Sequence, residues 1–556
     1  MGKSVKKKTN ASTLVLLPLG GTGEIGMNCY CYGVGHDDAR EWLMVDLGVK
    51  FGEDSDPGID VVLPDVSFIA KNRKKLAGLV LTHAHEDHIG GVPWLWPQLK
   101  CPIYCTPFAA ALLNNKLKEH GLDEDVKVHI IPLGGKFKVG SFDLEFVNVT
   151  HSIPEPCALL IKTKHGTAFH SGDWKIDRTP TFGAGIDEKR LAEIGDNGVD
   201  VLICDSTNVL REGFSPSERD VADTLMEIVA HAKGRVAITT FASHVERVAS
   251  AVRAARACGR EVVLAGRAMR NTIEAARACG YLHDAGAFLD EDSFGYLPPN
   301  KILLLCTGSQ GESRAAISRI AEDQHSNIAL EKGDLVIFSS RTIPGNEKEV
   351  ALVHNNLAKL DVDVLTADDA LVHTSGHPRQ DELRLMYEWL KPKALVPMHG
   401  EARHLRAHAK FARSCGIAEA LIPLDGNIMR LSPTPLENYD EVSSGRLHVD
   451  GKLIVPVEDG PAKQRRKASM VGMVFISLAL DDKHHLADDV QITCDGLPAG
   501  LEAELLDAAE DAFENMPKPR RKDEGTVAET IRIAVRRCAE QIWGKKPVCK
   551  VLVQRV

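Results

Sequence analysis

The chain has 556 residues, of which 44% are hydrophobic and 26% charged, and its formal net charge is −10. A length so far above ~150 residues predicts about three domains. The composition is that of an ordinary globular protein and excludes the disordered and fibrous classes. Because the sequence holds no apolar run of about 18 residues, we expect no membrane helix.

The charge balance does not favour a nucleic-acid-binding protein, since such proteins usually carry a basic surface. Local basic clusters can still attract phosphate, and they occur at Lys71–Lys75, Lys463–Lys467 and Lys518–Lys522. Each cluster is more often a solvated surface or a linker than a binding site. Net charge alone therefore does not decide whether the substrate is polyanionic.

The N-terminus and the cysteines favour a cytoplasmic location. Residues 1–10 are basic, but no long apolar segment with a small-residue cleavage site follows, so we predict no signal peptide. The 13 cysteines include no C-x-x-C pair. They fit reduced thiols better than a disulfide framework, and they indicate no cysteine-type zinc site.

From Leu14 to about Asn208 the sequence consists of short strand-like runs separated by Gly, Pro and Asp. Strands are predicted at 14–20, 28–35, 41–48, 76–83, 101–106, 142–151, 157–163, 167–173 and 199–207. Several of these runs end in His or Asp, which would gather polar side chains at one edge of a sheet, where sites in layered folds commonly lie.

From Val209 to Ala370 helices alternate with strands, which predicts an inserted α/β region. The predicted helices cover 217–232 and 244–259, and the predicted strands cover 235–241, 261–266, 301–309 and 334–340. A helix from about Gln380, a strand and a His-bearing turn follow, so the insert interrupts one domain. After a linker-like stretch at 460–469, two strands, helices around 504–515 and 527–541, and a last strand predict a small α+β domain.

The sequence Thr82-His-Ala-His-Glu-Asp-His-Ile-Gly-Gly91 directly follows a predicted strand and is the strongest chemical signal in the chain. It holds His83, His85, Asp87 and His88 at fixed offsets, a pattern that chance rarely produces. Imidazole and carboxylate ligands suit Zn²⁺, and hydrolytic two-metal sites hold the ions ~3.5 to 4 Å apart. Four ligands cannot fill two sites, so further ligands must come from elsewhere.

Candidates for the missing ligands stand at the ends of other predicted strands: His151, Asp173 and His399. Taken singly, such a residue is more often a capping or buried polar side chain than a metal ligand. Together with the 83–88 cluster, the three become strong candidates for the same metal centre.

These residues, with Asp205 and the His373-Thr-Ser-Gly-His377 segment, resemble the successive motifs of the β-CASP family of metallo-β-lactamase-fold nucleases, and most closely its ribonuclease J group. The resemblance covers nearly the whole chain, through the well-separated motifs GGTGEIGMN, DLGVKF, THAHEDHIGG, GDWKID, DSTN, TGSQGE, RTIPGNE, HTSGH and PMHGE. It implies an α/β fold, an αββα metallo-β-lactamase sandwich with an inserted α/β β-CASP domain and a small α+β C-terminal domain. The implied boundaries are 12–208 and 371–455 for the sandwich, 209–370 for the β-CASP domain, 456–470 for a linker and 471–556 for the last domain.

The resemblance also implies roles for single residues. One zinc ion would be held by His83, His85 and His151, the other by Asp87, His88 and His399, and Asp173 would bridge them. Asp46, at the end of a predicted strand, would orient a ligand from behind, as metal sites generally require. His377 is our candidate general acid, Asp205 would orient or tune it, and Asp87 completes the predicted catalytic set.

The RNA contacts implied by the resemblance lie in two segments. The loop formed by His373, Thr374, Ser375, Gly376 and His377 precedes a helix and can offer backbone N–H groups to a phosphate. The second segment comprises Ala242, Ser243 and His244 and would contact the RNA or its 5′-phosphate. The family more often has Asn where this chain has His244, so phosphate recognition is expected to be altered.

One apparent motif is rejected. Gly21-Thr-Gly-Glu-Ile-Gly26 fits the G-x-G-x-x-G pattern of dinucleotide sites and has Asp46 at a suitable distance. However, the residues that follow predict a strand rather than a helix. We expect a tight turn in which Gly tolerates positive φ.

The resulting prediction is a zinc-dependent ribonuclease with two Zn²⁺ per subunit. It would degrade single-stranded RNA from the 5′ end and favour a 5′-monophosphate. Its role would be RNA processing and decay, including rRNA processing and mRNA decay. Endonuclease activity, assistance by Mn²⁺ or Mg²⁺, a homodimeric or homotetrameric state and association with other RNA-degradation proteins are left open. Two alternatives are a β-CASP nuclease that processes DNA and a small-molecule metallo-hydrolase, since fold and ligands alone do not choose a substrate. A third is a non-catalytic scaffold, which the intact metal ligands disfavour.

Overall fold

The computed structural model describes residues 12–53, 55–458 and 460–556. It divides into two compact units. The larger unit comprises the chain up to Lys50 together with Val62–Leu447, and the smaller comprises Phe51–Val61 and His448–Val556.

Two sheets face each other in the larger unit. The first has the order β24-β23-β1-β3-β4-β7-β8-β9. Its strands are β1 (Thr13–Gly20), β3 (Cys29–Gly35), β4 (Glu41–Val45), β7 (Leu76–Val80), β8 (Ile103–Cys105), β9 (Val128–Ile130), β23 (Asn427–Ser432) and β24 (Glu437–Glu441). The second has the order β10-β11-β12-β13-β14-β20-β22. Its strands are β10 (Lys136–Val139), β11 (Phe142–Asn148), β12 (Cys157–Thr163), β13 (Gly166–His170), β14 (Val201–Asp205), β20 (Ala394–Met398) and β22 (Glu419–Ala420).

The core of the sandwich lies between these sheets. Alternate residues of each strand point inward because side chains in a strand alternate between its faces, and Leu16 and Val45 of the first sheet share one cluster with Phe146, Leu159 and Ile203 of the second. All five side chains are fully buried. Removal of this apolar surface from water is the main stabilising contribution to the sandwich.

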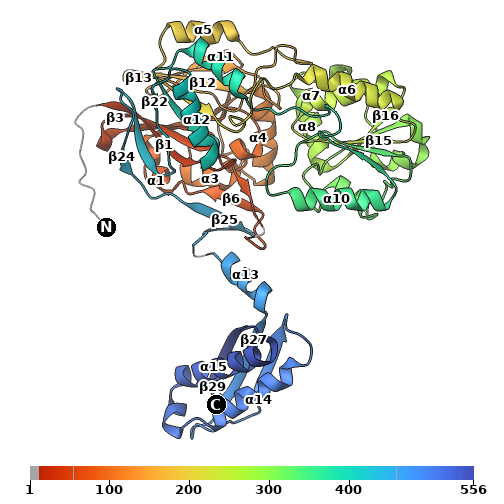
Figure 1. Cartoon of the computed structure of the whole chain (residues 1–556). Helices are drawn as coiled ribbons and strands as arrows, with labels where there is room; N and C mark the ends of the chain where they lie inside the picture. The colour runs from red at the N-terminus through yellow and green to blue at the C-terminus, as the bar shows by residue number, and fades with distance from the viewer. Residues whose placement is uncertain (1–11, 54, 459) are drawn as a thin grey trace. The chain divides into compact units, whose positions relative to one another are not determined.

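Helices cover the outside of the sandwich, which confirms the predicted αββα layering. Helices α5 (Glu188–Asp196), α11 (Gln380–Leu390) and α12 (Ala402–Ser414) lie together over the second sheet (Figure 1). They bury Leu191, Leu383 and Ala409 against its outer face. Helix α1 (Ser67–Lys71) packs on α3 (Val92–Leu99), and α4 (Pro107–Glu119) contacts β9 at the edge of the first sheet.

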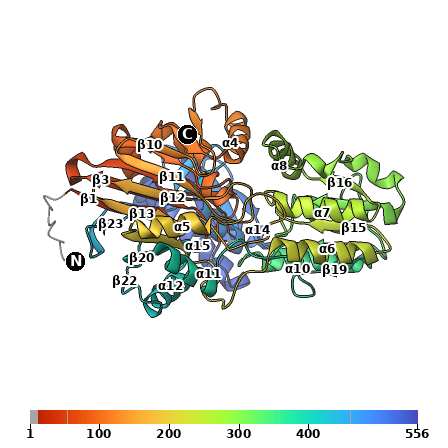
Figure 2. The ribbon, with the colours of Figure 1, turned by 90° about the horizontal axis from the view of Figure 1, so that it is seen from above.

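The inserted region forms its own parallel sheet between β14 and β20. Its order is β16-β17-β15-β18-β19, with β15 (Val236–Thr239), β16 (Glu261–Ala265), β17 (Ile302–Cys306), β18 (Leu335–Phe338) and β19 (Asp363–Leu365). Helix α7 (Val245–Ala257) lies against β16 and β17, with α6 (Glu218–His231) and α8 (Arg267–Ala278) beside it. Helices α9 (Ala316–Ala321) and α10 (Glu347–Lys359) pack on the same sheet through Ile317 and Leu357. Helix α10 lies beside β15 and β19 of this sheet in Figure 2. The predicted alternation of helices and strands is confirmed.

The smaller unit ends in a two-layer domain. Strands β27 (Met473–Leu480), β28 (Gln491–Asp495) and β29 (Val548–Arg555) form a sheet with β27 in the middle. Helices α14 (Leu501–Glu514) and α15 (Glu524–Trp543) pack on it through Leu505, Phe513 and Ile531. The predicted α+β domain is confirmed, but most of the predicted linker is a helix, α13 (Ala462–Val471). Its run of Ala, Lys, Gln and Arg without Gly or Pro favours helix over loop.

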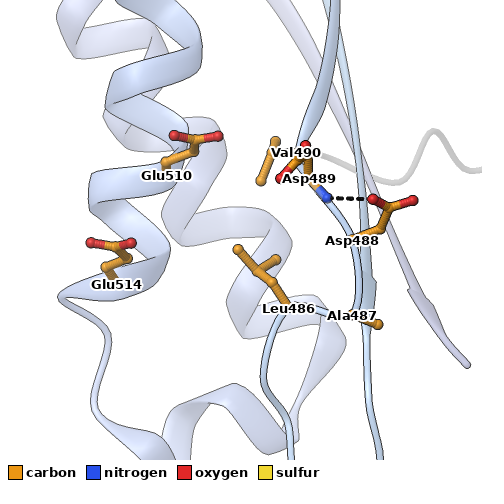
Figure 3. Close-up of a pocket in the computed structure, with 7 residues that line it drawn as sticks. All are labelled: Leu486, Ala487, Asp488, Asp489, Val490, Glu510 and Glu514. Atoms are coloured by element: carbon orange, nitrogen blue, oxygen red, sulfur yellow. Dashed lines mark hydrogen bonds between the residues drawn. The ribbon is translucent and has the colours of Figure 1, made fainter.

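A pocket of this domain lies between α14 and the segment before β28 (Figure 3). It is lined by Leu486, Ala487, Asp488, Asp489, Val490, Glu510 and Glu514. The four carboxylates would repel a phosphate, so this pocket is not a candidate RNA site.

The rejected dinucleotide motif opens no helix, as expected, but it is not a simple turn, because Thr22–Gly23 form the short strand β2, which pairs with β21 (Gly400–Glu401). Gly21, Gly23 and Gly26 all have positive φ, and the strand β3 follows rather than a helix. A side chain at Gly20 would stand 2.1 Å from the carbonyl oxygen of Met27, so the chain returns too closely for any other residue.

All 13 cysteines are free thiols in this structure. Among the helices of the described residues, none combines the length and apolar character that crossing a bilayer requires.

Candidate metal centre

The predicted ligands come together because five strands of the sandwich end at the same place. β7 precedes His83, β11 precedes His151 and β13 precedes Asp173, while β14 ends in Asp205 and β20 precedes His399. In the second sheet β13, β14 and β20 are parallel neighbours, and Asp205 is paired with Met398. The carboxyl ends of these strands therefore deliver side chains to one edge.

The short helix α2 (Glu86–Ile89) carries Asp87 and His88, and the backbone around Gly48 fixes its position. The amides of Leu47 and Val49 donate hydrogen bonds to the carbonyl oxygens of His88 and Glu86. A side chain at Gly48 would stand 1.7 Å from the carbonyl oxygen of Asp87. The close approach of the two segments thus requires glycine at position 48.

His83, His85 and His151 form one group of nitrogens that could hold a metal ion. His83 Nε2 lies 3.0 Å from His85 Nδ1, which lies 3.1 Å from His151 Nε2. Nitrogens bound to one tetrahedral zinc ion, at ~2.0 to 2.1 Å from it, stand about 3.3 Å apart. The spacing and donor type fit a zinc ion at this place.

Asp87, His88, Asp173 and His399 form the second group. His399 Nε2 lies 3.1 Å from Asp87 Oδ2, and His88 Nε2 lies 3.3 Å from Asp173 Oδ2. These nitrogen and oxygen donors also suit zinc.

Asp173 connects the two groups through one oxygen. Besides its contact with His88, Asp173 Oδ2 lies 3.7 Å from His151 Nε2 and 3.9 Å from His83 Nε2. Its other oxygen, Oδ1, is buried and has no hydrogen-bond partner among the described residues. An unpartnered buried carboxylate oxygen is costly, so Oδ1, which lies 3.6 Å from His399 Nδ1 in the second group, favours a nearby cation.

Burial and mutual charge set the protonation of these side chains. Burial lowers the pKa of His83 and His151, and it lowers the pKa of His85 to about 4. Burial alone would raise the pKa of Asp173, but the surrounding histidines hold it well below its usual range. The neutral imidazoles of His83, His85 and His151 beside an ionised carboxylate are forms that bind metal ions, whereas burial is outweighed by neighbouring carboxylates, which raise the pKa of His88 and His399.

Asp46 contacts His88 through the ring nitrogen Nδ1. It is fully buried with φ of 61°, and its Oδ2 lies 2.7 Å from His88 Nδ1. It also accepts hydrogen bonds from the amide and the hydroxyl of Thr82, at 2.8 and 2.9 Å. The contact fixes which ring nitrogen of His88 faces the metal group.

Thr207 supports His399 in the same way, although it is not among the residues predicted from the sequence. Its Oγ1 lies 2.9 Å from His399 Nδ1 and donates to Asp205 Oδ1 at 2.7 Å. The only signal in the sequence was its place in the DSTN motif, directly after a strand that ends in a carboxylate.

Asp205 also holds His377. His377 Nδ1 lies 2.8 Å from Asp205 Oδ2, and the same nitrogen lies 3.9 Å from Asp173 Oδ2. Burial alone would lower the pKa of His377, but the carboxylates of Asp205 and Asp173 raise it above its ordinary value. The contact with Asp205 engages Nδ1 and not Nε2.

The His373–His377 loop is attached to the first group of ligands. The Gly376 carbonyl oxygen lies 2.6 Å from His151 Nδ1, and a side chain at Gly376 would stand 2.4 Å from the same ring atom. Ser375 Oγ accepts a hydrogen bond from Asn208 Nδ2 at 2.7 Å. Thr374 donates to the Pro216 carbonyl oxygen. The loop is held within reach of the metal groups.

Residues 242–244 lie outside this cluster of ligands. Ala242 and Ser243 are half-buried, whereas the His244 ring is buried and its Nε2 lies 3.2 Å from Glu218 Oε1. Glu218 also pairs with Arg247, at 2.8 Å, inside the protein. The His244 ring therefore takes part in a buried polar network, and the charges of His244 and Arg247 both contribute to the low pKa of His373, after burial.

Comparisons with known proteins identify related families. Four family models match the chain: the beta-lactamase superfamily domain at residues 55–265, the ribonuclease J beta-CASP domain at 233–357, the Zn-dependent metallo-hydrolase RNA specificity domain at 369–423 and the ribonuclease J C-terminal domain at 462–556.

Alignments with similar proteins extend over most of the chain. It is 46% identical to ribonuclease J of Sinorhizobium meliloti over 98% of this chain and 97% of the relative. It is 36% identical to ribonuclease J of Corynebacterium glutamicum over 97% of this chain and 76% of the relative. A solved structure, a protein of unknown function from Enterococcus faecalis V583, aligns with a TM-score of 0.53 at 18% identity and covers 76% of this chain and 100% of that one. This last likeness concerns the fold alone.

Proposed function

The chain belongs to the ribonuclease J family and is a metal-dependent hydrolase of RNA, and from this premise we propose that it uses two zinc ions to degrade single-stranded RNA from the 5′ end, with preference for a 5′-monophosphate. The observation that carries the proposal is the position of Asp173, whose Oδ2 faces both groups of ligands while His377 stands beside it. The proposal extends to RNA processing and decay in the cytoplasm.

Each group of ligands has a role in this proposal. His83, His85 and His151 would hold one zinc ion, Asp87, His88 and His399 the other, and Asp173 would be shared. Asp46 would orient His88. When bound, such a pair supplies the Lewis acidity that phosphodiester hydrolysis requires.

The protein's own proton donor is His377. Its Nδ1 faces Asp205, so that the opposite nitrogen, Nε2, can give a proton to the leaving oxygen of the cleaved bond. Asp205 acts as a positioning residue that keeps the imidazole in one orientation. In the loop before α11, residues 373–377 would offer backbone N–H groups and hydroxyls to a phosphate, while Ala242 and Ser243 would contact the strand from the β-CASP side.

The oligomeric state and the partners belong to the same proposal. We expect a homodimer or homotetramer and association with other RNA-degradation proteins, as the resemblance implies. Light scattering on the purified protein measures the oligomeric state, and copurification tests the association with other proteins.

The test of the proposed activity is a time course on end-labelled single-stranded RNA that bears a 5′-monophosphate, a 5′-triphosphate or a 5′-hydroxyl, with matched DNA beside it. Release of mononucleotides from the 5′ end, fastest with the monophosphate, is the expected result. Internal fragments as first products would replace the exonuclease mode by an endonuclease mode. Intact RNA beside cleaved DNA would overturn the substrate but not the metal centre.

The metal requirement is tested on the same substrates. Asp87→Ala should lower the zinc content from two ions per subunit to about one and abolish turnover, because a two-metal site needs both ions. Unchanged turnover with one ion would show that the second group of ligands is not catalytic.

A further inference from the structure

Three arginines whose guanidinium groups no carboxylate neutralises lie on segments that border the candidate metal centre. Arg211 follows β14, Arg341 follows β18, and Arg379 immediately precedes α11. Each therefore stands near the carboxyl end of a strand or beside the His373–His377 loop. None of the three belongs to the residues predicted to bind RNA.

The backbone brings these three segments together. The amide of Gln380, next to Arg379, donates to the carbonyl oxygen of Arg211 at 3.0 Å. Ser339 Oγ, two residues before Arg341, donates to the carbonyl oxygen of Val372 at 2.7 Å, at the start of the loop.

Two more side chains hold the segments in place. Asn208, three residues before Arg211, donates to Ser375 Oγ and to the carbonyl oxygen of His377. The Gln310 amide group contacts the Arg341 carbonyl oxygen and the Ile343 amide, so the 341–346 loop is also fixed.

The acids closest in sequence are engaged elsewhere. Glu382 accepts hydrogen bonds from the amides of Ile176, Ser215 and Arg379. Asp381 pairs with Arg384, and Glu312 accepts a hydrogen bond from the backbone N–H of Gln310. Within the described part of the chain, no carboxylate forms an ion pair with Arg211, Arg341 or Arg379.

The charges of Arg341 and Arg379 act on Arg211. Burial lowers the pKa of Arg211, and the charges of Arg341 and Arg379 lower it further. In addition, Arg379 Nε is buried and has no hydrogen-bond partner among the described residues. Like charges held together and a buried donor without an acceptor are both unfavourable. An anion at this place would relieve both.

We propose that Arg211, Arg341 and Arg379 bind a backbone phosphate of the RNA strand, close to but separate from the metal centre. Guanidinium groups match the oxygens of a phosphate through paired hydrogen bonds and remain charged at any working pH. The arginine cluster, defined as these three residues, supplies the local positive charge that the net charge of −10 conceals. The inference rests on RNA being the substrate.

The test measures RNA binding and its salt dependence for Arg211→Gln, Arg341→Gln and Arg379→Gln. The full-length protein carries His377→Ala to slow cleavage during the measurement, and the probes are labelled single-stranded RNAs with a 5′-phosphate or a 5′-hydroxyl. Each substitution should weaken binding about threefold to tenfold at ~0.1 M salt and lower the slope of log K against log salt by about 0.7 per lost contact. The loss should be equal for both 5′ ends.

Two matched variants serve as controls. Arg384→Gln removes one positive charge from the same helix, α11, but its side chain pairs with Asp381 and stacks over Phe411. It should leave binding and slope unchanged. Arg379→Lys keeps the charge but not the paired hydrogen bonds. It should keep the parent's salt slope while losing part of the affinity, whereas a loss of folding would change both.

The outcomes separate this inference from the proposed function. If the parent protein binds and, with His377 restored, cleaves RNA while the glutamine variants keep the parent's salt slope, the arginine cluster does not bind phosphate and the ribonuclease proposal stands. A loss confined to 5′-phosphorylated RNA would overturn the backbone assignment and identify a terminal phosphate site. If the parent protein with His377 does not cleave RNA, the proposed function itself fails.

Discussion

Asp205 is the side chain at which the two halves of the candidate site meet. One of its oxygens faces His377 and the other accepts the Thr207 hydroxyl, which in turn contacts His399. The same carboxylate thus orients the proposed proton donor and, through one hydroxyl, a proposed metal ligand. Substitutions of single residues around Asp205 separate proton transfer from metal binding.

His377→Ala should reduce the cleavage rate by about 10² to 10⁴, the usual contribution of a general acid. Zinc content should stay near that of the parent protein, because His377 faces Asp205 rather than the first group of ligands. Metal analysis and single-turnover kinetics on the same preparation measure both quantities. Loss of zinc would reassign His377 to the metal site.

Thr207→Val should weaken zinc binding about 10-fold to 100-fold, since hydrogen bonds behind metal-binding histidines usually contribute that much. The substitution keeps the side-chain shape but removes the hydroxyl between His399 and Asp205. Thr207→Ser retains the hydroxyl and should restore the affinity. Competition with a zinc chelator measures the change, and equal affinity in both variants would mean that Thr207 only fills space.

At the scale of secondary structure, α7 joins the inserted sheet to the sandwich. Its Arg247 pairs with Glu218 of α6 and also donates to the carbonyl oxygens of Ser339 and Val372, just before the His373–His377 loop. A buried ion pair of this kind specifies one arrangement of its neighbours, although its net contribution to stability is small. The loop is therefore positioned by a helix of the insert as well as by the sandwich.

Glu246 precedes Arg247 in α7 and makes the stability of the folded protein depend on pH. Burial and the charge of Glu218 raise the pKa of Glu246 to about 7, and its carboxylate accepts a hydrogen bond from the Thr181 amide. The folded protein keeps this proton at pH values where the unfolded chain has lost it. The contribution of the protonated carboxyl is therefore fully present below pH 4.5, the ordinary pKa of a glutamate side chain, and is lost as the pH rises through about 7.

Glu246→Gln should remove this dependence. The variant should be more stable than the parent protein at pH 8, and the difference should shrink towards pH 5, because the parent carboxyl is then neutral. Thermal unfolding at a series of pH values measures it. Glu274→Gln, on the exposed face of α8, is the control and should follow the parent curve; a difference that stays constant with pH would contradict the assignment.

For the whole molecule, the C-terminal domain has a core of its own. Val474, Leu505, Phe513, Ile531 and Val535 belong to one cluster, which is formed by residues of this domain alone. Residues 462–556 should therefore unfold cooperatively when expressed alone. Phe513→Ala should destabilise this fragment by about 3 to 5 kcal/mol, the usual cost of removing a buried aromatic ring.

Circular dichroism during heating and denaturant titration measures both effects. A fragment without a cooperative transition would show that this domain depends on the rest of the chain. In the complementary experiment, the chain that ends at residue 461 should keep its zinc content, because all proposed ligands precede that point.

The sequence by itself predicted the strands, the insert and the candidate ligands, because each depends on local information. Short apolar runs between breaker residues predicted strands such as 157–163, which the structure confirms residue for residue as β12. The fixed offsets of His83, His85, Asp87 and His88 indicated a metal site, because these residues lie within one short segment.

Only the tertiary structure decided which distant residues support that site and which do not. Thr207 contacts His399 because β14 and β20 are neighbours in the sheet, although the two residues lie 192 positions apart. The buried pairing of His244 with Glu218 and the convergence of the segments that carry Arg211, Arg341 and Arg379 also depend on strand order and loop packing. The physical reason is that contacts between remote segments arise only when the sheets assemble, whereas a single sequence records the period and chemistry of each segment separately.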